Sequence, residues 1–209
     1  IENPEPALAV SALLTKAKAD GLETLNWGES AQGLRRRAAF LRSLTGDGPD
    51  LSDSTLSGAL DLWLAPLLAG KSALSDISPG ALDDAIGAQM DWAQLKVLDA
   101  MAPASWIAPT GTHVRIDYAA EAGPSGEVRV QELFGLDQHP TVAGGRVPLI
   151  LVLLSPARRP IQVTRDLPGF WRGSWKAVRS DLRGRYPKHP WPEDPLAAPP
   201  TMRAKPRGS

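Results

Sequence analysis

The sequence predicts an α+β fold: a helical N-terminal half, then a small, mainly antiparallel sheet with a C-terminal helix and an extended proline-rich tail. Apolar residues recur at spacings of three and four up to about Met101, but alternate with polar residues after Pro103. Four prolines fall between Tyr186 and Pro195, where neither a helix nor a central strand can form. We therefore expect a helical region over 1–102, a sheet-and-helix region over 103–184, and a proline-rich strap with a loose basic tail over 185–209.

Five helical segments are expected in the first hundred residues, at 6–18, 29–44, 53–64, 79–90 and 91–101. Ser52 or Asp53 is suited to cap the third segment, because a hydroxyl or carboxylate at this position accepts hydrogen bonds from unpaired backbone N–H groups. Ser78 followed by Pro79 marks the start of the fourth segment. The last segment supplies the apolar residues Trp92, Leu95, Leu98 and Met101 and is stopped by Pro103.

Strands are expected after Pro103, at 114–118, 128–131, 149–154 and 161–164, with a loop over 119–126. The continuous aliphatic run 149–154 is typical of a central strand that is buried on both faces. It forms a predicted hairpin with the run 161–164. Asp166 can then cap one helix that extends from about Leu167 to Arg183.

The composition excludes several classes of chemistry. The 209 residues include no cysteine, which rules out disulfides, thiolate metal sites and a cysteine nucleophile. Three histidines without ligand spacing predict no metal site. No apolar run reaches the roughly 18 residues that span a bilayer, and the first residues do not form a signal peptide. We expect a cytoplasmic protein and, because no initiator methionine is present, a fragment of a longer chain.

The zero net charge conceals an asymmetry between the two halves. Residues 1–100 carry 8 basic and 14 acidic residues, whereas residues 101–209 carry 15 basic and 9 acidic ones. Such a division is expected when one end of a protein meets a polyanion. A dipolar solvated surface, or packing of the two halves against each other, would explain it equally well.

No self-contained active site is visible. Gly70-Lys71-Ser72 resembles the end of a phosphate loop, but Ala65 stands where the required first glycine should be. A turn between two helices explains this stretch better. No nucleophile elbow or metal-ligand pattern is present, so we predict no catalytic residue and no metal site in this chain.

The strongest cluster of chemically distinctive residues is basic and aromatic, and it lies in the C-terminal third. Its candidate nucleic-acid-binding residues are Arg158, Arg159, Arg165, Arg172, Lys176, Arg179, Arg183, Arg185 and Lys188. Cations neutralise phosphates, and the interleaved aromatic rings can stack on unpaired bases. For Trp171 and Trp175 a place in the core is favoured. We expect Trp191, with Tyr186, to anchor the strap on the folded body. The basic residues either bind nucleic acid or pair with carboxylates of the acidic half.

Several stretches resemble the C-terminal region of HrpB-type ATP-dependent helicases, bacterial proteins of the DEAH/DExH group, over roughly residues 30 to 207. The most specific is the proline-rich string Arg183-Gly184-Arg185-Tyr186-Pro187-Lys188-His189-Pro190-Trp191-Pro192-Glu193-Asp194-Pro195. The others are Trp63-Leu64-Ala65-Pro66, Ile116-Asp117-Tyr118, Gln131-Glu132-Leu133-Phe134-Gly135, Gly145-Arg146-Val147-Pro148-Leu149, Leu154-Ser155-Pro156-Ala157-Arg158-Arg159-Pro160, and Gln162-Val163-Thr164-Arg165-Asp166-Leu167 with Phe170-Trp171.

The resemblance implies a part of a larger helicase, whose ATP, Mg²⁺ and catalytic motifs would lie in the helicase core of the same parent chain. The fragment itself is expected to need no cofactor. Two roles follow from it: an accessory module that helps the motor to bind RNA or single-stranded DNA, or a structural or protein-docking module that braces the core or recruits a partner.

The isolated chain is expected to show neither ATPase activity nor saturable ATP binding, because it contains no phosphate loop. Isothermal titration with Mg-ATP measures this directly. Stoichiometric, Mg-dependent binding would contradict the interpretation of the sequence.

Overall fold

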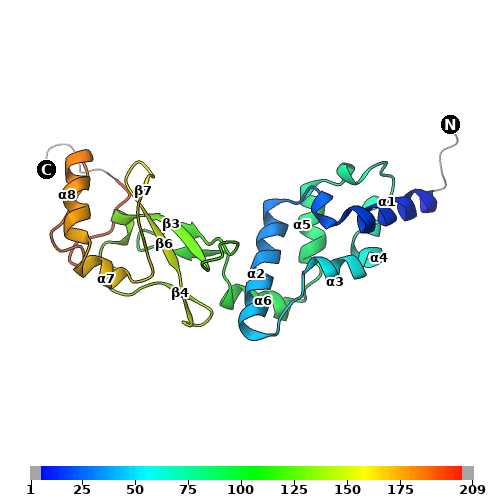
Figure 1. The fold of residues 1–209 in the computed structure, drawn as a ribbon, viewed down its shortest axis with the longest axis horizontal. Helices are drawn as coiled ribbons and strands as arrows, with labels where there is room; N and C mark the ends of the chain where they lie inside the picture. Colours follow the sequence, from blue (N-terminus) through cyan, green and yellow to red (C-terminus); the bar gives the residue numbers. More distant parts are fainter. Residues whose placement is uncertain (1–5, 204–209) are drawn as a thin grey trace. The chain divides into compact units, whose positions relative to one another are not determined.

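The computed structural model describes residues 6–203, so the last part of the predicted basic tail, 204–209, lies outside the described residues. The chain forms two compact units, Ile1–Ala102 and Pro103–Ser209, here called unit 1 and unit 2. In the described residues, unit 1 contains helices only, whereas unit 2 combines strands with two C-terminal α-helices (Figure 1). The predicted α+β class, with its change of period near Pro103, is confirmed.

Unit 1 is built from short helices around an aliphatic core. Its α-helices are α1 (Pro6–Asp20), α2 (Glu29–Thr45), α3 (Asp53–Gly58), α4 (Leu60–Trp63), α5 (Pro79–Gly87) and α6 (Trp92–Met101). Three single turns connect them: η1 (Leu22–Thr24), η2 (Ala65–Leu68) and η3 (Leu74–Asp76). The predicted caps are present, since the side chains of Ser52 and Ser78 accept hydrogen bonds from Thr55 N and Ala81 N.

One expectation for unit 1 is wrong. The segment 53–64 is not one helix, because Ala59 leaves the helical conformation after Gly58. The Trp63 indole then donates to the Leu56 carbonyl across the break (2.9 Å). Helix α6 buries Leu98 only, and Trp92 is 73% exposed beside the ammonium group of Lys96.

Between Pro103 and Arg203, the described part of unit 2, the strands form three small sheets. The main sheet has the order β3 (Ser125–Arg129), β6 (Ile150–Leu154), β7 (Pro160–Thr164); β6 lies in the centre, parallel to β3 and antiparallel to β7. Two antiparallel pairs accompany it: β1 (Ser105–Ile107) with β2 (His113–Arg115), and β4 (Thr141–Val142) with β5 (Val147–Pro148). The predicted central strand and its hairpin are confirmed.

The expected strand over 128–131 is displaced toward the N-terminus. Strand β3 begins within the predicted loop and ends at Arg129, where the turn η4 (Val130–Leu133) begins. Glycine suits position 126 of this strand because it has no Cβ atom. A Cβ atom at this position would lie only 2.9 Å from the Val114 side chain, which is too close. The turn η4 directs the polar side chains of Gln131 and Glu132 into the interior.

The predicted C-terminal helix is two helices, α7 (Leu167–Arg172) and α8 (Trp175–Arg185). Asp166 caps α7 as expected, because its carboxylate accepts from Gly169 N (2.9 Å). The chain leaves the helical path at Gly173, where the glycine lies against the Gly169 carbonyl. On either side of the break, Trp171 and Trp175 meet edge to face, with ring centroids 5.4 Å apart.

Five rings form the aromatic core of unit 2: Phe134, Phe170, Trp171, Trp175 and Trp191. All are buried, and each indole N–H donates to a backbone carbonyl: Trp171 to Leu136, Trp175 to Pro192 and Trp191 to Tyr186. The core is therefore apolar in its interior and free of unpaired indole donors.

The segment 186–203 contains no helix or strand, yet it is tied to the body at several points. Trp191 is 6% exposed, and its carbonyl accepts from Arg179 Nε (2.9 Å). Gly135 N donates to the Pro195 carbonyl (2.9 Å), and Thr201 N donates to the Gln131 carbonyl (3.0 Å). Up to Thr201 the segment is thus held more closely than the loose tail expected from composition.

Replacing Trp191 by alanine is expected to destabilise unit 2 by about 3–5 kcal/mol, because it removes a buried ring from the aromatic core. The melting temperature, followed by circular dichroism, should fall by more than about 10 °C. Trp92→Ala is the matched control, since the Trp92 ring is mostly exposed and its loss should shift melting far less. Similar shifts for the two variants, or ready proteolysis at Lys188 in the native chain, would contradict a buried anchor.

Candidate functional site

The nine basic candidate residues do not form one stripe. The break at Gly173 places Arg172 at the end of α7, whereas Lys176, Arg179, Arg183 and Arg185 belong to α8. The single helix expected from Leu167 to Arg183 would have placed Arg172, Lys176, Arg179 and Arg183 along one face, and the break contradicts this expectation. Arg158 and Arg159 lie in the turn between β6 and β7, and Arg165 follows β7.

Three of the nine hold other parts of unit 2. Arg179 donates to the Trp191 carbonyl and approaches Glu193 (3.3 Å), so it fastens the proline-rich segment. Arg185 pairs with Asp181 one turn earlier (3.0 Å). Arg165 donates to the Ala122 carbonyl. Each of these three guanidinium groups therefore has a hydrogen-bond or ion-pair partner within unit 2.

The other six basic side chains are exposed and have no side-chain partner among residues 6–203. They are Arg158, Arg159, Arg172, Lys176, Arg183 and Lys188. A cation with no ion pair inside the protein keeps its full charge and its donors available to an external anion.

One contact brings four of these six to the same end of unit 2. The Tyr186 hydroxyl, just after α8, meets the buried Ser155 hydroxyl at the end of β6 (3.3 Å). Arg158 and Arg159 follow Ser155, and Arg183 and Lys188 flank Tyr186. We call Arg158, Arg159, Arg183 and Lys188 the basic cluster.

The turn that carries two of these arginines is closed by hydrogen bonds. Ser155 N donates to the Arg159 carbonyl (2.8 Å), and Arg159 N donates to the Ser155 hydroxyl (3.1 Å). Arg158 adopts a positive φ of 59°, a conformation that costs an L-residue energy and is frequent at functional sites. The turn therefore holds both exposed arginines on a defined backbone.

The turn η4 contains a buried carboxylate, that of Glu132, which no pattern in the sequence indicated. Glu132 is 3% exposed and accepts hydrogen bonds from Thr110, Thr112 and Arg129. Burial raises the pKa of Glu132, but the hydrogen bonds from Thr112, Arg129 and Thr110 outweigh it and hold the pKa below its usual value. Glu132 is thus a structural anion.

Beside it, the Gln131 side chain is completely buried and bonds to His189 Nδ1 of the proline-rich segment (3.2 Å). Burial, and then the charge of Arg129, lower the pKa of His189. The imidazole is therefore neutral at pH 7, which leaves a ring nitrogen able to accept from the Gln131 amide.

His139 is also structural. His139 Nδ1 accepts from Leu167 N (3.1 Å), and its Nε2 contacts the Leu149 carbonyl (2.6 Å), so it joins the start of α7 to the chain before β6. Within residues 6–203, no group of three or more metal-ligating side chains is close enough to hold an ion. Nor does this part of the chain contain a helix long and apolar enough to cross a membrane.

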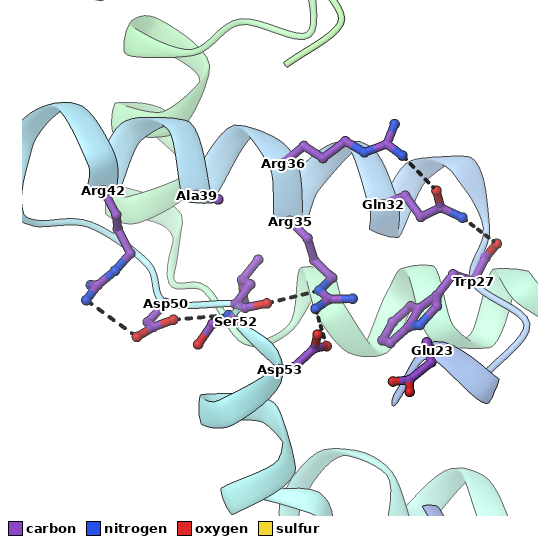
Figure 2. A pocket seen from close by; sticks show the side chains of 11 residues that line it. Glu23, Trp27, Gln32, Arg35, Arg36, Ala39, Arg42, Asp50, Ser52 and Asp53 are labelled. Atoms are coloured by element: carbon purple, nitrogen blue, oxygen red, sulfur yellow. Dashed lines mark hydrogen bonds and ion pairs between the residues drawn. The ribbon is translucent and has the colours of Figure 1, made fainter. Parts of the chain in front are cut away.

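Unit 1 contains a groove of about 740 Å³, which no pattern in the sequence indicated (Figure 2). Helix α2 forms one wall with Arg35, Arg36 and Arg42, and the segment 50–53 forms the other. The one sequence feature that could have pointed to this groove is the run of three arginines at 35–37. Its three side chains diverge: Arg35 lies over the Trp27 ring (4.8 Å), Arg36 is exposed, and Arg37 is buried against Asp99 and the Ala102 carbonyl.

The groove is less suited to an anion than the basic cluster. Its three arginines are balanced by the carboxylates of Glu23, Asp50 and Asp53. Arg35 pairs with Asp53 (2.6 Å) and Arg42 with Asp50 (3.4 Å), as the dashed lines in Figure 2 show. Hydrogen bonds from Ser52, together with Arg42, lower the pKa of Asp50, so this carboxylate stays charged.

The Gly70-Lys71-Ser72 stretch has no phosphate-binding geometry. It lies between the turns η2 and η3, where the backbone N–H groups of Ser72 and Ala73 donate to the Asp76 carboxylate (3.0 and 2.9 Å). The donors that a phosphate would need are thus taken by the chain itself.

Glu132→Gln is expected to destabilise unit 2 by about 2 kcal/mol at pH 7, because three donors lose a charged acceptor. The folded pKa of Glu132 is lowered, so its stabilisation exists above the unfolded pKa of about 4.3 and is lost as pH falls through the folded pKa. Urea unfolding at several pH values should show the difference from the unmodified chain shrinking below about pH 4. Glu127→Gln, an exposed carboxylate on β3, is the control. A difference that does not change with pH would contradict this account.

Comparison with known proteins gives concordant results. The family model described as "ATP-dependent helicase C-terminal" matches residues 63–195, more than half of the chain. The Escherichia coli (strain K12) protein "ATP-dependent RNA helicase HrpB" is 41% identical over 198 residues, which cover 93% of this chain and 24% of that protein. The chain thus spans about a quarter of its relative.

Two solved structures are similar. The crystal structure of the E. coli DExH-box NTPase HrpB matches with a TM-score of 0.86 and 38% identity over 98% of this chain and 26% of that one. The crystal structure of the E. coli DEAH/RHA helicase HrpB matches with a TM-score of 0.72 and 37% identity over 91% of this chain and 24% of that one. Sequence and fold agree, and the chain belongs to the family of the C-terminal region of HrpB-type ATP-dependent helicases.

Proposed function

We propose that this chain is an accessory nucleic-acid-binding region of a cytoplasmic ATP-dependent helicase, and that it helps the motor to hold RNA or single-stranded DNA. The helicase core of the same parent chain is its expected partner. That core would bind ATP and Mg²⁺, while this region takes neither. Membership of the helicase family and the surface of unit 2 support the proposal.

The observation that carries the proposal is the set of six exposed basic side chains without partners in unit 2. Four of them, the basic cluster, are gathered at one end by the contact between Tyr186 and Ser155. A polyanion binds such a surface because each neutralised phosphate releases condensed counterions. The C-terminal half also carries six more basic than acidic residues, which attracts polyanions at longer range.

The alternative role is a brace or docking module for the helicase core. Arg179, although it is counted among the basic candidates, holds the proline-rich segment of the same unit. Arg179 is therefore excluded from the binding set, and the variants below leave it intact.

Arg158→Gln/Arg159→Gln is expected to weaken binding of the 209-residue chain to a labelled single strand. The slope of log K against log salt concentration should flatten by about 1.4–1.8, since each lost phosphate contact contributes about 0.7–0.9. Fluorescence anisotropy between 50 and 200 mM KCl measures the slope.

The matched control is Lys18→Gln/Lys71→Gln, which removes the same charge from two exposed lysines of unit 1. It should leave the slope almost unchanged. Equal flattening in both variants would indicate diffuse electrostatic attraction without a defined surface. Absence of binding at low salt would refute the function and favour the bracing role.

A further inference from the structure

We infer that the outer face of α6 in unit 1 is a docking surface for a helix of the parent chain that lies outside these 209 residues. That helix presents an apolar stripe and one carboxylate. The inference goes beyond the proposed function, because it concerns unit 1 and holds whether or not unit 2 binds nucleic acid. It starts from Trp92, which is 73% exposed.

The outer face of α6 is apolar, although the solvent-facing side of a surface helix is normally polar. With about 3.6 residues per turn, the side opposite the buried Leu98 carries Trp92, Ala93, Lys96, Val97 and Ala100. All five are exposed, and only Lys96 is charged. Single exposed apolar residues are ordinary, but a continuous apolar face that includes an indole is typical of an interaction site.

The helix does not need a partner in order to form. Its first turn is closed by reciprocal hydrogen bonds: Gln94 N donates to the Asp91 carboxylate (2.7 Å), and Asp91 N donates to the Gln94 amide oxygen (3.0 Å). At its other end, Arg37 of α2 binds Asp99 and the Ala102 carbonyl. The apolar face is therefore held on a well-anchored helix, and fraying does not explain its exposure.

The shape of this face suits another helix. Ala93, Val97 and Ala100 follow one another at spacings of four and three, so small side chains form a shallow stripe along α6. The side chains of a second helix pack into such a stripe at interaxial distances of about 8–10 Å. Trp92 stands at the N-terminal end of the stripe, and tryptophan is the kind of anchor that contributes most to interfaces.

The charge on this face indicates what the second helix carries. The Lys96 ammonium lies 4.8 Å from the Trp92 ring centroid and has no ion pair among residues 6–203. Covering it without a counterion would leave a buried, unpaired charge, so the partner has to supply a carboxylate. A second copy of α6 is a poor partner, because antiparallel pairing about the middle of the face would bring two Lys96 ammonium groups together.

The parent chain is the source of the helix that the comparisons favour. The matched region covers 24% of the E. coli helicase and 26% of the first solved structure, so these relatives contain much more chain than the part matched here. A helix supplied by the same chain has a high effective concentration, so a face as small as that of α6 is sufficient for docking. Such docking would hold unit 1 against the rest of the helicase.

The test measures oxidation of side chains by hydroxyl radicals in the full-length parent chain and in the 209-residue chain. Trp92 should be oxidised about fivefold more slowly in the full-length chain, because the rate follows exposed area and a docked indole is almost fully desolvated. Lys96→Glu should restore most of the oxidation, since it sets two carboxylates against each other. Lys18→Glu, the same change at an exposed lysine of α1, should leave Trp92 protected.

The facing carboxylate is tested by a carbodiimide, which joins an amine to a carboxylate in direct contact. It should link Lys96 to an acidic residue outside the 209 residues, identified by mass spectrometry. Lys96→Arg, which keeps the charge but not the reactive amine, should lose the cross-link and keep Trp92 protected. Protection that survives Lys96→Glu would contradict the proposed partner.

Other results would overturn the docking itself. Equal oxidation of Trp92 in both chains would show that the face is free in the full-length protein. Slow oxidation already in the 209-residue chain would show that this chain covers the face itself. Protection that appears only as the concentration rises, with a dimer in sedimentation, would identify a second copy as the occupant. None of these results bears on strand binding by unit 2, which the salt slopes test separately.

Discussion

Burial of the Trp175 ring is the interaction on which the architecture of unit 2 depends. The ring contacts Phe134, Phe170, Trp171 and Trp191, and its N–H donates to the Pro192 carbonyl. Residues four and seven positions further along α8 lie on the same helix face, so Arg179 turns inward and Leu182 is buried. The same geometry leaves Lys176 and Arg183 in solvent.

Burial of Trp175 also decides which basic side chains of α8 face the core and which face the solvent. Because Arg179 faces the core side of α8, it meets the carbonyl of Trp191 and holds the proline-rich segment in place. That segment in turn supplies Trp191 to the aromatic core and His189 to the buried Gln131. One arginine thus stabilises the fold, while its neighbours on the outer face of the helix remain free to meet an anion.

In unit 1, too, the helix face decides whether a basic side chain is used within the fold, as a run of three arginines shows. Arg35 covers Trp27, whose other neighbour is Trp63 (ring centroids 6.1 Å apart), and Arg37 is buried against the end of α6. Only Arg36 is exposed. A buried guanidinium requires nearly all of its donors to be paired, so Arg37 connects α2 firmly to the residue at which unit 1 ends. Adjacent identical residues therefore have different roles according to the helix face on which they lie.

The sequence by itself determined the helical half, the caps at Ser78 and Asp166, the central strand 149–154 and the family, because these depend on local spacing and residue order. It also identified every basic residue of the cluster. Tertiary structure decided the break at Gly173, the inward turn of Gln131 and Glu132, the groove beside α2, and the division of the cations into bonded and free. These features depend on partners distant along the chain: Tyr186 reaches Ser155, and Thr110 reaches Glu132. A periodic pattern shows which face a side chain occupies, but only packing decides what that face meets.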